Sequence, residues 1–564
     1  MKRFLSKHAD WLLTLFFGLV VFLFWACRYP FALTFQEQLQ LFLFDGDYFC
    51  ERMAEPGGLA RYIAEFLVQF YNAPVYGALI LAVLFMTLQR LTWRLMRCEG
   101  YYYLSLIPAL VLWFAMGDEN VMLAYVVALI MAMGCIFGLR QLERLSLIGR
   151  VFIALVSLPL IYWFIGPLAL LVAVCMVPAW LAGVAAIYVV ALVLSSAWLL
   201  PYPLMRLAVG IGYYRFPVTI PYLLILIPVL IAMMYYGCRH LPKPKQWLKY
   251  ALVLGVTALL FVPQHFGFEV KKYEQMEYDY LVRIKDWNGI IAKAEQQTPD
   301  KPMSVSATNL ALAMTNQLGE RAFEFYQRGS EGLLPPFERN YATTLLTGEI
   351  YFHLGLINTA ERLAFEAMEA ITNYNKSGRA LKRLVETNII NGQYKVAEKY
   401  IKMLEKTIFY RRWAEHMRAM LGDEKAINAH PLYGTLRQYR LQEDFLFSDT
   451  ELDKICGQLF MHNHKNQMAA QYLLLMPLLD RDVPRFMQYV QYVQSQIRYN
   501  PRSCQEAIAF AFMQQRQQPP QGLVSPLILQ QLNDFSRIYS AGGKDAPGLE
   551  QFRNTAWYYL MVGK

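Results

Sequence analysis

Leu43-Phe44-Asp45-Gly46-Asp47-Tyr48-Phe49 is the stretch around which the chain is organised. It lies in an acidic, aromatic segment, 28–72, between two apolar runs at about 10–27 and 73–95. Each run is long enough to cross a bilayer, which needs about 20 predominantly apolar residues. The sequence therefore predicts a loop that leaves the membrane, carries two carboxylates and returns.

A helical pattern follows Pro56-Gly57-Gly58, where the acidic part of the loop ends. Apolar residues recur there at helical spacing, namely Leu59, Tyr62, Ile63, Phe66, Leu67 and Phe70. Arg61, Glu65 and Gln69 fall on the opposite face of the same helix. We expect this helix to lie along the membrane surface with its apolar face toward the bilayer.

The composition changes along the chain. Of the 564 residues, 56% are hydrophobic and only 17% are charged, and the apolar runs end near residue 266. The predicted fold is all-α, a polytopic transmembrane bundle followed by a soluble α-solenoid. The expected domains are a transmembrane domain at 1–266 with its outer loop at 28–72, tetratricopeptide-like repeats at 267–422, and a C-terminal helical domain at 423–564.

The net charge of +10 does not indicate a nucleic-acid partner. In a membrane protein, Lys and Arg gather in cytoplasmic loops and set the orientation of the chain. The eight cysteines include no C-x-x-C pair and no neighbouring histidine pattern, which argues against a structural zinc site.

We predict about nine membrane spans, at 10–27, 73–95, 101–117, 120–139, 150–165, 168–184, 185–200, 219–237 and 249–264. Region 166–200 is ambiguous, because it fits two short spans or one long, bent span. Basic loops at 140–150 and 238–249 favour two spans, since an even number of crossings must separate them.

Charge sets the expected orientation. One side carries Lys2, Arg3, Lys7, Arg90, Arg94, Arg97, Arg140, Arg144, Arg150, Arg239, Lys243, Lys245 and Lys249, against Glu99 and Glu143. The other side carries the acidic first loop and the turn at Asp118-Glu119. The positive-inside rule then predicts a bacterial inner-membrane protein with a cytoplasmic N-terminus and a periplasmic second half.

Paired short helices are predicted after about residue 273. Gly319, Gly355 and Gly392 are 36 and 37 residues apart, close to the tetratricopeptide period. Ala360 and Ala397 fall where a small residue suits a helix crossing. Repeats of this type commonly present a face to a protein partner, and the alternative is a packing domain without a ligand. Helices are also expected at about 484–497 and 503–514.

Asp45 and Asp47 are the first candidate site residues. They read equally as solvated loop carboxylates, with Asp45-Gly46 forming a turn. Their apolar neighbours, however, would raise a carboxyl pKa and suit it to general-base catalysis. Two acids so spaced could also share a divalent cation, Mg²⁺ or Mn²⁺.

Two further outer segments carry candidate substrate-binding residues. Asp118 and Glu119 form a short acidic turn, which a solvated hairpin would also explain. Arg206 and Arg215 lie in an aromatic segment, 201–219, and suit a lipid phosphate. Snorkelling at the membrane interface explains these arginines equally well.

The first half resembles the GT-C superfamily of membrane glycosyltransferases over about residues 10–140. The resemblance lies in Asp45-Gly46-Asp47-Tyr48-Phe49, Glu55-Pro56-Gly57-Gly58-Leu59-Ala60-Arg61-Tyr62 and Asp118-Glu119-Asn120-Val121-Met122-Leu123. It implies a polyprenyl-phosphate sugar donor and a first-loop acid, Asp45 or Asp47, that acts on the acceptor. Gly46 splits the acidic pair that is adjacent in many members of that superfamily, so the choice between the two stays open.

Two functions follow. The first is a glycosyltransferase-like enzyme that moves a sugar from a lipid phosphate to a periplasmic acceptor, with Asp45 or Asp47 as base and Arg206 and Arg215 on the phosphate. The second is a non-catalytic, membrane-anchored scaffold for envelope assembly. Convergence of the candidate residues on one cavity would favour the enzyme. A transporter is disfavoured, because the spans hold few ionisable groups.

Overall fold

The computed structural model is helical, as predicted. It describes residues 2–96, 98, 100–140, 146–216, 219–238, 241–335, 341–373, 375–441 and 451–563. These residues contain no β-strand, and their β-structure is limited to two isolated bridges, Val121–Tyr214 and Arg328–Ser330.

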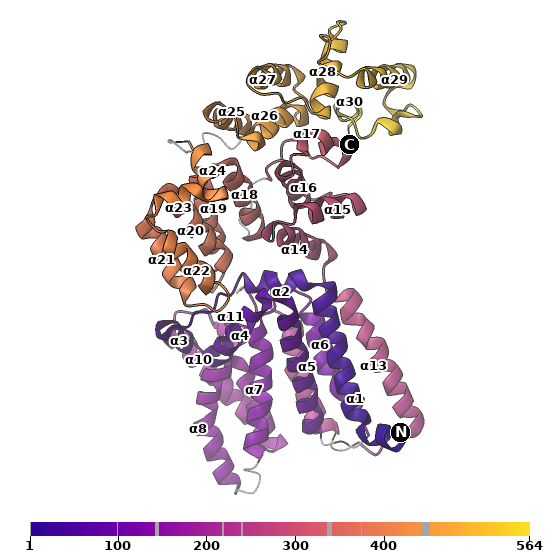
Figure 1. Ribbon diagram of the computed structural model, residues 1–564. Coiled ribbons are helices and arrows are strands. Elements are labelled where there is room, and N and C mark those ends of the chain that lie inside the picture. Colours follow the sequence, from indigo (N-terminus) through magenta and orange to yellow (C-terminus); the bar gives the residue numbers. More distant parts are fainter. Residues whose placement is uncertain are drawn as a thin grey trace. The chain divides into compact units, whose positions relative to one another are not determined.

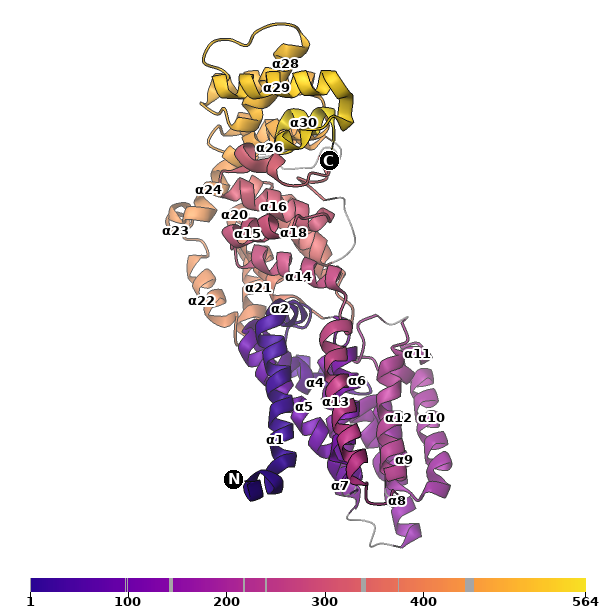
Figure 2. The ribbon, with the colours of Figure 1, turned by 90° about the vertical axis from the view of Figure 1, so that its right-hand side faces the viewer.

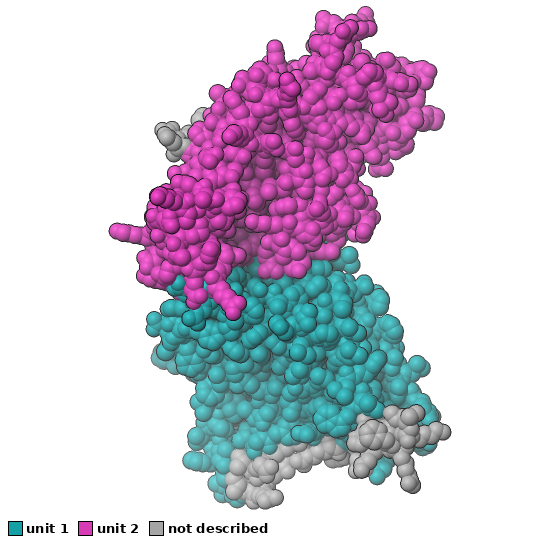
Figure 3. All heavy atoms as spheres, viewed as in Figure 1, with its two compact units in different colours: residues 1–274, 371–378, 405–411 teal, residues 275–370, 379–404, 412–564 magenta. Residues whose placement is uncertain are grey.

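The chain divides into two compact units (Figure 3). Unit 1 contains residues 1–274 together with two short segments from the second half, 371–378 and 405–411. Unit 2 contains residues 275–370, 379–404 and 412–564. The division is therefore not a single cut in the sequence, because two loops of the repeat region belong to the apolar unit.

Unit 1 is built from apolar helices and shorter connecting helices. The α-helices are α1 (Lys2–Leu23), α2 (Pro30–Glu37), α3 (Gly46–Met53), α4 (Gly58–Val68), α5 (Pro74–Met96), α6 (Ile107–Ala115), α7 (Leu123–Arg140), α8 (Leu147–Ile165), α9 (Ala169–Met176), α10 (Ala182–Leu199), α11 (Leu204–Val209), α12 (Tyr222–Gly237) and α13 (Gln246–Phe266). The long helices run roughly side by side, and α2 and α11 lie at the end of the bundle opposite the N-terminus (Figure 1, Figure 2).

Five helical segments of the described residues are long and apolar enough to cross a membrane: Asp10–Arg28, Pro74–Met96, Val151–Met176, Ala182–Leu199 and Gln246–Phe266. Three shorter apolar segments in unit 1, Tyr102–Ala115, Leu123–Leu139 and Tyr222–Gly237, coincide with other predicted spans. The exposed apolar side chains of the long helices, such as Leu15, Leu79 and Trp198, suit a lipid environment.

The ambiguous region 166–200 breaks earlier than expected. Helix α9 ends at Met176, Val177 is extended with φ −101° and ψ 160°, and Pro178 follows. Helix α10 then runs without interruption from Ala182 to Leu199, through the expected boundary at 184–185. The physical reason is Pro178, because the residue before a proline is pushed out of the helical conformation.

The expected orientation was based partly on charged residues that lie outside the described residues, namely Arg97, Glu99, Glu143, Arg144 and Arg239.

Unit 2 continues with short helices. They are α14 (Val270–Arg283), whose first turns count with unit 1, α15 (Trp287–Gln296), α16 (Pro302–Met314), α17 (Leu318–Arg321), α18 (Tyr341–Leu354), α19 (Ile357–Glu369), α20 (Gly378–Asn391), α21 (Tyr394–Glu405), α22 (Arg411–Met420), α23 (Glu424–Ala429), α24 (Pro431–Tyr439), α25 (Leu452–His462), α26 (Gln467–Leu479), α27 (Val483–Gln496), α28 (Arg502–Gln514), α29 (Pro526–Gly542) and α30 (Ala556–Met561). Successive helices pack on each other, for example α15 on α16, α18 on α19 and α25 on α26.

The helix pairs follow the predicted register in two places. Gly355 and Gly392 lie in inter-helix turns with φ of 100° and 76°, a conformation that glycine adopts readily. Ala360 of α19 and Ala397 of α21 are fully buried. Gly319, in contrast, lies inside α17, and Asn316 with φ 58° makes the turn before it. The helices expected at 484–497 and 503–514 are α27 and α28.

Candidate functional site

A tight turn sets the geometry of the first loop by folding α3 back on α4. Gly57 has φ 86°, and its N–H donates to the carbonyl of Trp163 in α8 (2.8 Å). Gly58 comes so close to Arg52 that an added Cβ would lie 2.0 Å from the Arg52 carbonyl oxygen. Only glycine fits there, which explains the Pro56-Gly57-Gly58 break seen in the sequence.

Helix α4 buries the face that the sequence assigned to solvent. Arg61, Glu65 and Gln69 are all buried, at 5%, 1% and 6% exposure. The apolar residues of the other face, including Tyr62 and Phe66, are half-buried. The prediction of an exposed charged face is therefore wrong. Small residues beside the charges, namely Gly58, Ala60 and Ala64, let neighbouring segments approach closely, and the charges satisfy one another.

Four buried charges form the centre of the site. Glu65 accepts hydrogen bonds from Arg61 Nε (2.9 Å) and Arg52 Nε (2.7 Å). Arg61 Nη1 donates to Glu55. The Tyr48 hydroxyl donates to Glu65 Oε2, the oxygen that also accepts from Arg52. Two guanidiniums and two carboxylates balance in charge, as buried ions must if they are not to cost several kcal/mol each. We call Arg52, Glu55, Arg61 and Glu65 the ionic network.

The loop 371–378 closes the ionic network from the second half of the chain. Asn375 Oδ1 accepts from Arg61 Nη2 (2.8 Å) and Arg52 Nη2 (3.1 Å). Arg61 Nη2 also donates to the backbone carbonyl of Asn373 (2.8 Å). More than 300 residues separate these partners in the sequence. The network thus holds a repeat-region loop within the apolar unit.

Burial and charge act in opposite directions on these groups. Burial would raise the pKa of Glu65, but the charges of Arg61 and Arg52 hold it below its ordinary value. Burial would likewise lower the pKa of Arg61, which Glu65 and Glu55 raise above its ordinary value. The pKa of Tyr48 is raised by burial and by Glu65. These effects favour the charged forms of Glu65 and Arg61, so Glu65 is a poor proton acceptor.

The second loop, 405–411, meets the candidate base Asp45. Lys406 Nζ donates to Asp45 Oδ2 (2.6 Å), and the Lys406 carbonyl accepts from Phe44 N (2.7 Å). The Lys406 ammonium holds the pKa of Asp45 below its ordinary value, so the expected raised pKa is wrong. The hydrogen bond from Lys406 outweighs the desolvation of this carboxylate. Asp47, in the first turn of α3, is exposed.

The acidic turn with Asp118 and Glu119 contacts the aromatic segment that contains Arg215. The Tyr214 hydroxyl donates to Asp118 Oδ2 (2.7 Å), and Arg215 N donates to the carbonyl of Asn120 (2.9 Å). Glu119 pairs with Lys272 (3.2 Å). The structure thus joins the acidic turn to the backbone of the aromatic segment through the Val121–Tyr214 bridge. Asp45 has a different partner, Lys406.

Arg206 lies beside a tyrosine that contacts the ionic network. Its guanidinium carbon is 5.8 Å from the ring centre of Tyr202, whose hydroxyl donates to Glu55 Oε2 (3.1 Å). Arg215 is buried, with its guanidinium 5.9 Å from the Phe35 ring. The two arginines that were expected to share one phosphate therefore have different surroundings.

A metal centre is not assembled from these acids. Within the described ranges, no group of three His, Cys, Asp or Glu side chains is placed to hold an ion. A hard divalent cation takes six or more oxygen ligands, partly from water. The sequence suggested Asp45 and Asp47 as the pair of acids that could share a divalent cation. In the structure the Lys406 ammonium pairs with the Asp45 carboxylate.

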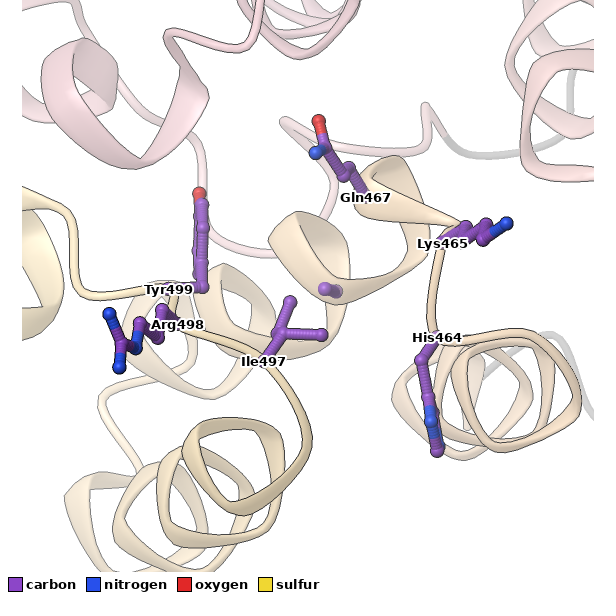
Figure 4. A pocket seen from close by; sticks show the side chains of 7 residues that line it. His464, Lys465, Gln467, Ile497, Arg498 and Tyr499 are labelled. Carbon is purple, nitrogen blue, oxygen red and sulfur yellow. The ribbon is translucent and has the colours of Figure 1, made fainter.

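A cavity of about 280 Å³ lies in unit 2, and its lining includes none of the predicted site residues (Figure 4). Its lining residues are His464, Lys465, Gln467, Ala470, Ile497, Arg498 and Tyr499. In Figure 4 the side chains of His464, Lys465 and Arg498 point in different directions rather than toward one point. The cavity therefore lacks a convergent cationic centre.

Sequence reasoning missed Arg52, Glu55 and the asparagines of the loop 371–378. One signal was present: Arg61 and Glu65 are four residues apart and share their face with Ala64 and Val68. Small and aliphatic residues beside a charge pair indicate close packing rather than a solvated face. No local signal marks Asn375, since its partners come from the other half of the chain.

The protein is an all-helical membrane protein, as its long apolar helices and its helical second unit indicate. Within that class, the chain belongs to the family described as a family of unknown function, DUF6057, whose model matches residues 6–563. No curated protein and no solved structure matches the chain.

Proposed function

We propose that the protein is a non-catalytic, membrane-anchored scaffold whose helical repeats hold a protein partner for envelope assembly. The observation that carries the proposal is the ionic network. Its carboxylates accept from Arg52, Arg61, Tyr48 and Tyr202. A general base needs an oxygen free to take a substrate proton. The most buried acids of the first loop act instead as attachment points for a repeat-region loop.

The placement of the predicted site residues also supports a scaffold. Asp45 is paired with Lys406, whereas Asp118 is held by Tyr214 and Asn120. In the described part of the chain these residues therefore have separate hydrogen-bond and ion-pair partners. Convergence on a single cavity was the feature that would have favoured catalysis.

The anchor in this proposal has nine spans, a cytoplasmic N-terminus and a solenoid second half in the periplasm of a bacterium. Five long apolar segments and three shorter ones among the described residues of unit 1 support a polytopic anchor. The acidic first loop would then lie outside, where positive-inside logic puts it.

The topology is tested with two reporter fusions. A reporter active only in the periplasm is attached after Lys271, and another is inserted within 243–249. The first should be active and the second silent. The reverse pattern would remove the periplasmic placement, and a signal from neither would be checked against the amount of fusion protein in the membrane.

The glycosyltransferase-like alternative retains one supporting observation. Asp47 is exposed in the first turn of α3 and has no ion-pair partner among the described residues. Its carboxylate is free to meet an acceptor hydroxyl, with a polyprenyl-phosphate sugar as donor. Loss of a general base typically costs 10²–10⁴-fold in rate, or about 3–5 kcal/mol of barrier.

Asparagine substitutions separate the two functions. Asp45→Asn, Asp47→Asn and the double variant are introduced into a strain that lacks the chromosomal gene, and the glycoconjugate profile of the cells is recorded. Glu51→Gln, an exposed acid of the same helix, is the matched control. Full complementation by all variants supports the scaffold. Loss of the profile in an Asp variant that is present at normal membrane levels would favour the enzyme.

A further inference from the structure

Aromatic side chains form a continuous row across the first loop of unit 1. Neighbouring ring centres in this row are 5.0–5.8 Å apart, in the order Phe49, Tyr62, Phe42, Phe66, Phe70 and Phe409. Phe49 lies on α3 and Phe66 on α4, whereas Phe409 lies on the loop 405–411. Segments from both halves of the chain therefore contribute to one row of rings, which we call the aromatic ridge.

The aromatic ridge is buried at Phe42 and exposed at its edges. Phe42 is 1% exposed and contacts the rings on either side of it. Phe49 is 42% exposed, and Phe44, whose ring centre is 5.0 Å from that of Phe42, is 49% exposed. At the other end, Ile408 is 46% exposed next to Phe409. Large apolar side chains that are exposed together mark a surface for a membrane or for another protein.

The chain continues from the aromatic ridge into a helix that suits a lipid environment. Phe70 lies just before α5, which begins at Pro74 and is long and apolar enough to cross a membrane. The first turns of α5 expose Val75, Tyr76 and Leu79. Figure 1 shows α3 and α4 toward the same end of the bundle as α2 and α11. The ridge is thus continuous with an apolar helix surface at the level where a span meets the bilayer interface, which Phe and Leu side chains of interfacial segments enter.

The charges beside the aromatic ridge do not favour an anionic lipid. Asp47 and Glu51 are exposed on α3. The Lys406 ammonium is paired with the Asp45 carboxylate (2.6 Å). Exposed carboxylates repel lipid phosphates, so a lipid contact at this surface depends on its apolar side chains.

We propose that the aromatic ridge, with Phe44 and Ile408 at its exposed edges, binds the interfacial region of the lipid bilayer. The sequence predicted such a role for α4 alone, whereas the ridge adds α3 and the loop 405–411. A segment of the second half of the chain is thereby in contact with lipid. The proposal goes beyond the scaffold function, because it does not depend on a protein partner.

The test measures the surroundings of single nitroxide labels on the full-length protein in nanodiscs of zwitterionic lipid. The three cysteines that are not buried, Cys27, Cys50 and Cys135, are first replaced by alanine. A label is then attached through Phe49→Cys or Ile408→Cys. Its collision rate with oxygen, which partitions into lipid, is compared with its collision rate with a water-soluble nickel chelate.

Both labels should favour oxygen and report a depth of about 5–10 Å below the headgroups, which is typical of an interfacial apolar surface. Leu79→Cys, at an exposed position of α5, is the control for lipid. Lys544→Cys, at an exposed position of unit 2, is the control for water and should favour the nickel chelate. Phe44→Cys takes the place of Phe49→Cys if that variant does not fold. Replacing part of the lipid by an anionic lipid should leave the depths unchanged, because the exposed charges on α3 beside the ridge are carboxylates.

Other results would overturn the proposal. A preference for the nickel chelate at both labels would place the aromatic ridge in water. Low collision rates with both reagents would show that protein, such as a second copy of the chain, covers it. Lipid contact at Phe49→Cys with water contact at Ile408→Cys would remove the loop 405–411 from the surface. A depth that increases with anionic lipid would assign the contact to headgroup charge rather than to the rings.

Discussion

Arg61 and Glu65 form a buried ion pair (2.9 Å) one helical turn apart on α4, and both also bind other segments of the chain. An isolated pair at this spacing on a helix surface contributes only about 0.3–0.5 kcal/mol. This pair lies instead at the centre of the ionic network, where Glu65 separates two guanidiniums. Its importance comes from burial, because an uncompensated charge at that depth is costly.

Glu65→Gln should therefore destabilise the protein by about 3–5 kcal/mol, because it removes the buried carboxylate that Arg52 and Arg61 share and leaves Arg52 with only the exposed Glu51. The comparison is Glu51→Gln, which removes an exposed carboxylate that also pairs with Arg52 (3.1 Å). A pair of that kind is worth about 0–1 kcal/mol. The measurement is denaturant unfolding of the purified protein in detergent. Equal stability of the two variants would show that the network does not stabilise the fold.

Asn375→Ala should free the loop 371–378, because its side chain accepts from both Arg61 and Arg52. Each lost hydrogen bond to a charged group is worth about 1.5–3 kcal/mol. The exposed Lys376 then becomes a more accessible trypsin site, which limited proteolysis of the folded protein detects. Asn288→Ala, at an exposed position of α15, should leave the cleavage rate unchanged. Cleavage at Lys376 that is as slow as in wild type would contradict the role of Asn375.

Much of the fold could be predicted from local patterns. Apolar runs mark the helices of unit 1, and the turn glycines Gly355 and Gly392 mark two helix pairs of unit 2. The boundary near Pro178 was missed, since the whole region is apolar and composition does not show where a helix breaks. The interior of the ionic network was missed for a different reason. Burial of Arg61 depends on Asn373 and Asn375, and no local periodicity reports contacts over such a separation.

Ala360→Arg and Ala397→Arg test the predicted register of the helix pairs. Both alanines are fully buried, so arginine would overpack the crossing and bury a charge. Overpacking alone costs about 1–3 kcal/mol. The readout is the thermal transition of the full-length protein, with Ala419→Arg at an exposed position of α22 as control. Melting curves identical to the control for both variants would refute the register.

Glu506 gives unit 2 a pH dependence of defined sign. Its buried carboxyl lies in α28, where Oε1 accepts from Arg502 Nε (2.8 Å) and Oε2 from Ala556 N (2.7 Å). Burial raises the pKa of Glu506 to about 7, although the Ala556 N–H and the Arg502 charge oppose the change. Between about pH 4.5 and pH 7 the folded state therefore holds a proton that the unfolded state has lost.

The contribution of Glu506 to stability is complete below pH 4.5 and is lost as the pH rises through 7, by about 3 kcal/mol in all. His353 acts in the opposite direction, because burial brings its pKa to about 4 and its neutral form favours the folded state as the pH rises toward 6.5. The informative quantity is therefore the difference between wild type and Glu506→Gln. From pH 5 to pH 8, the free energy of unfolding of the wild type should fall relative to that of the variant. Parallel pH profiles would show that Glu506 ionises normally in the folded protein.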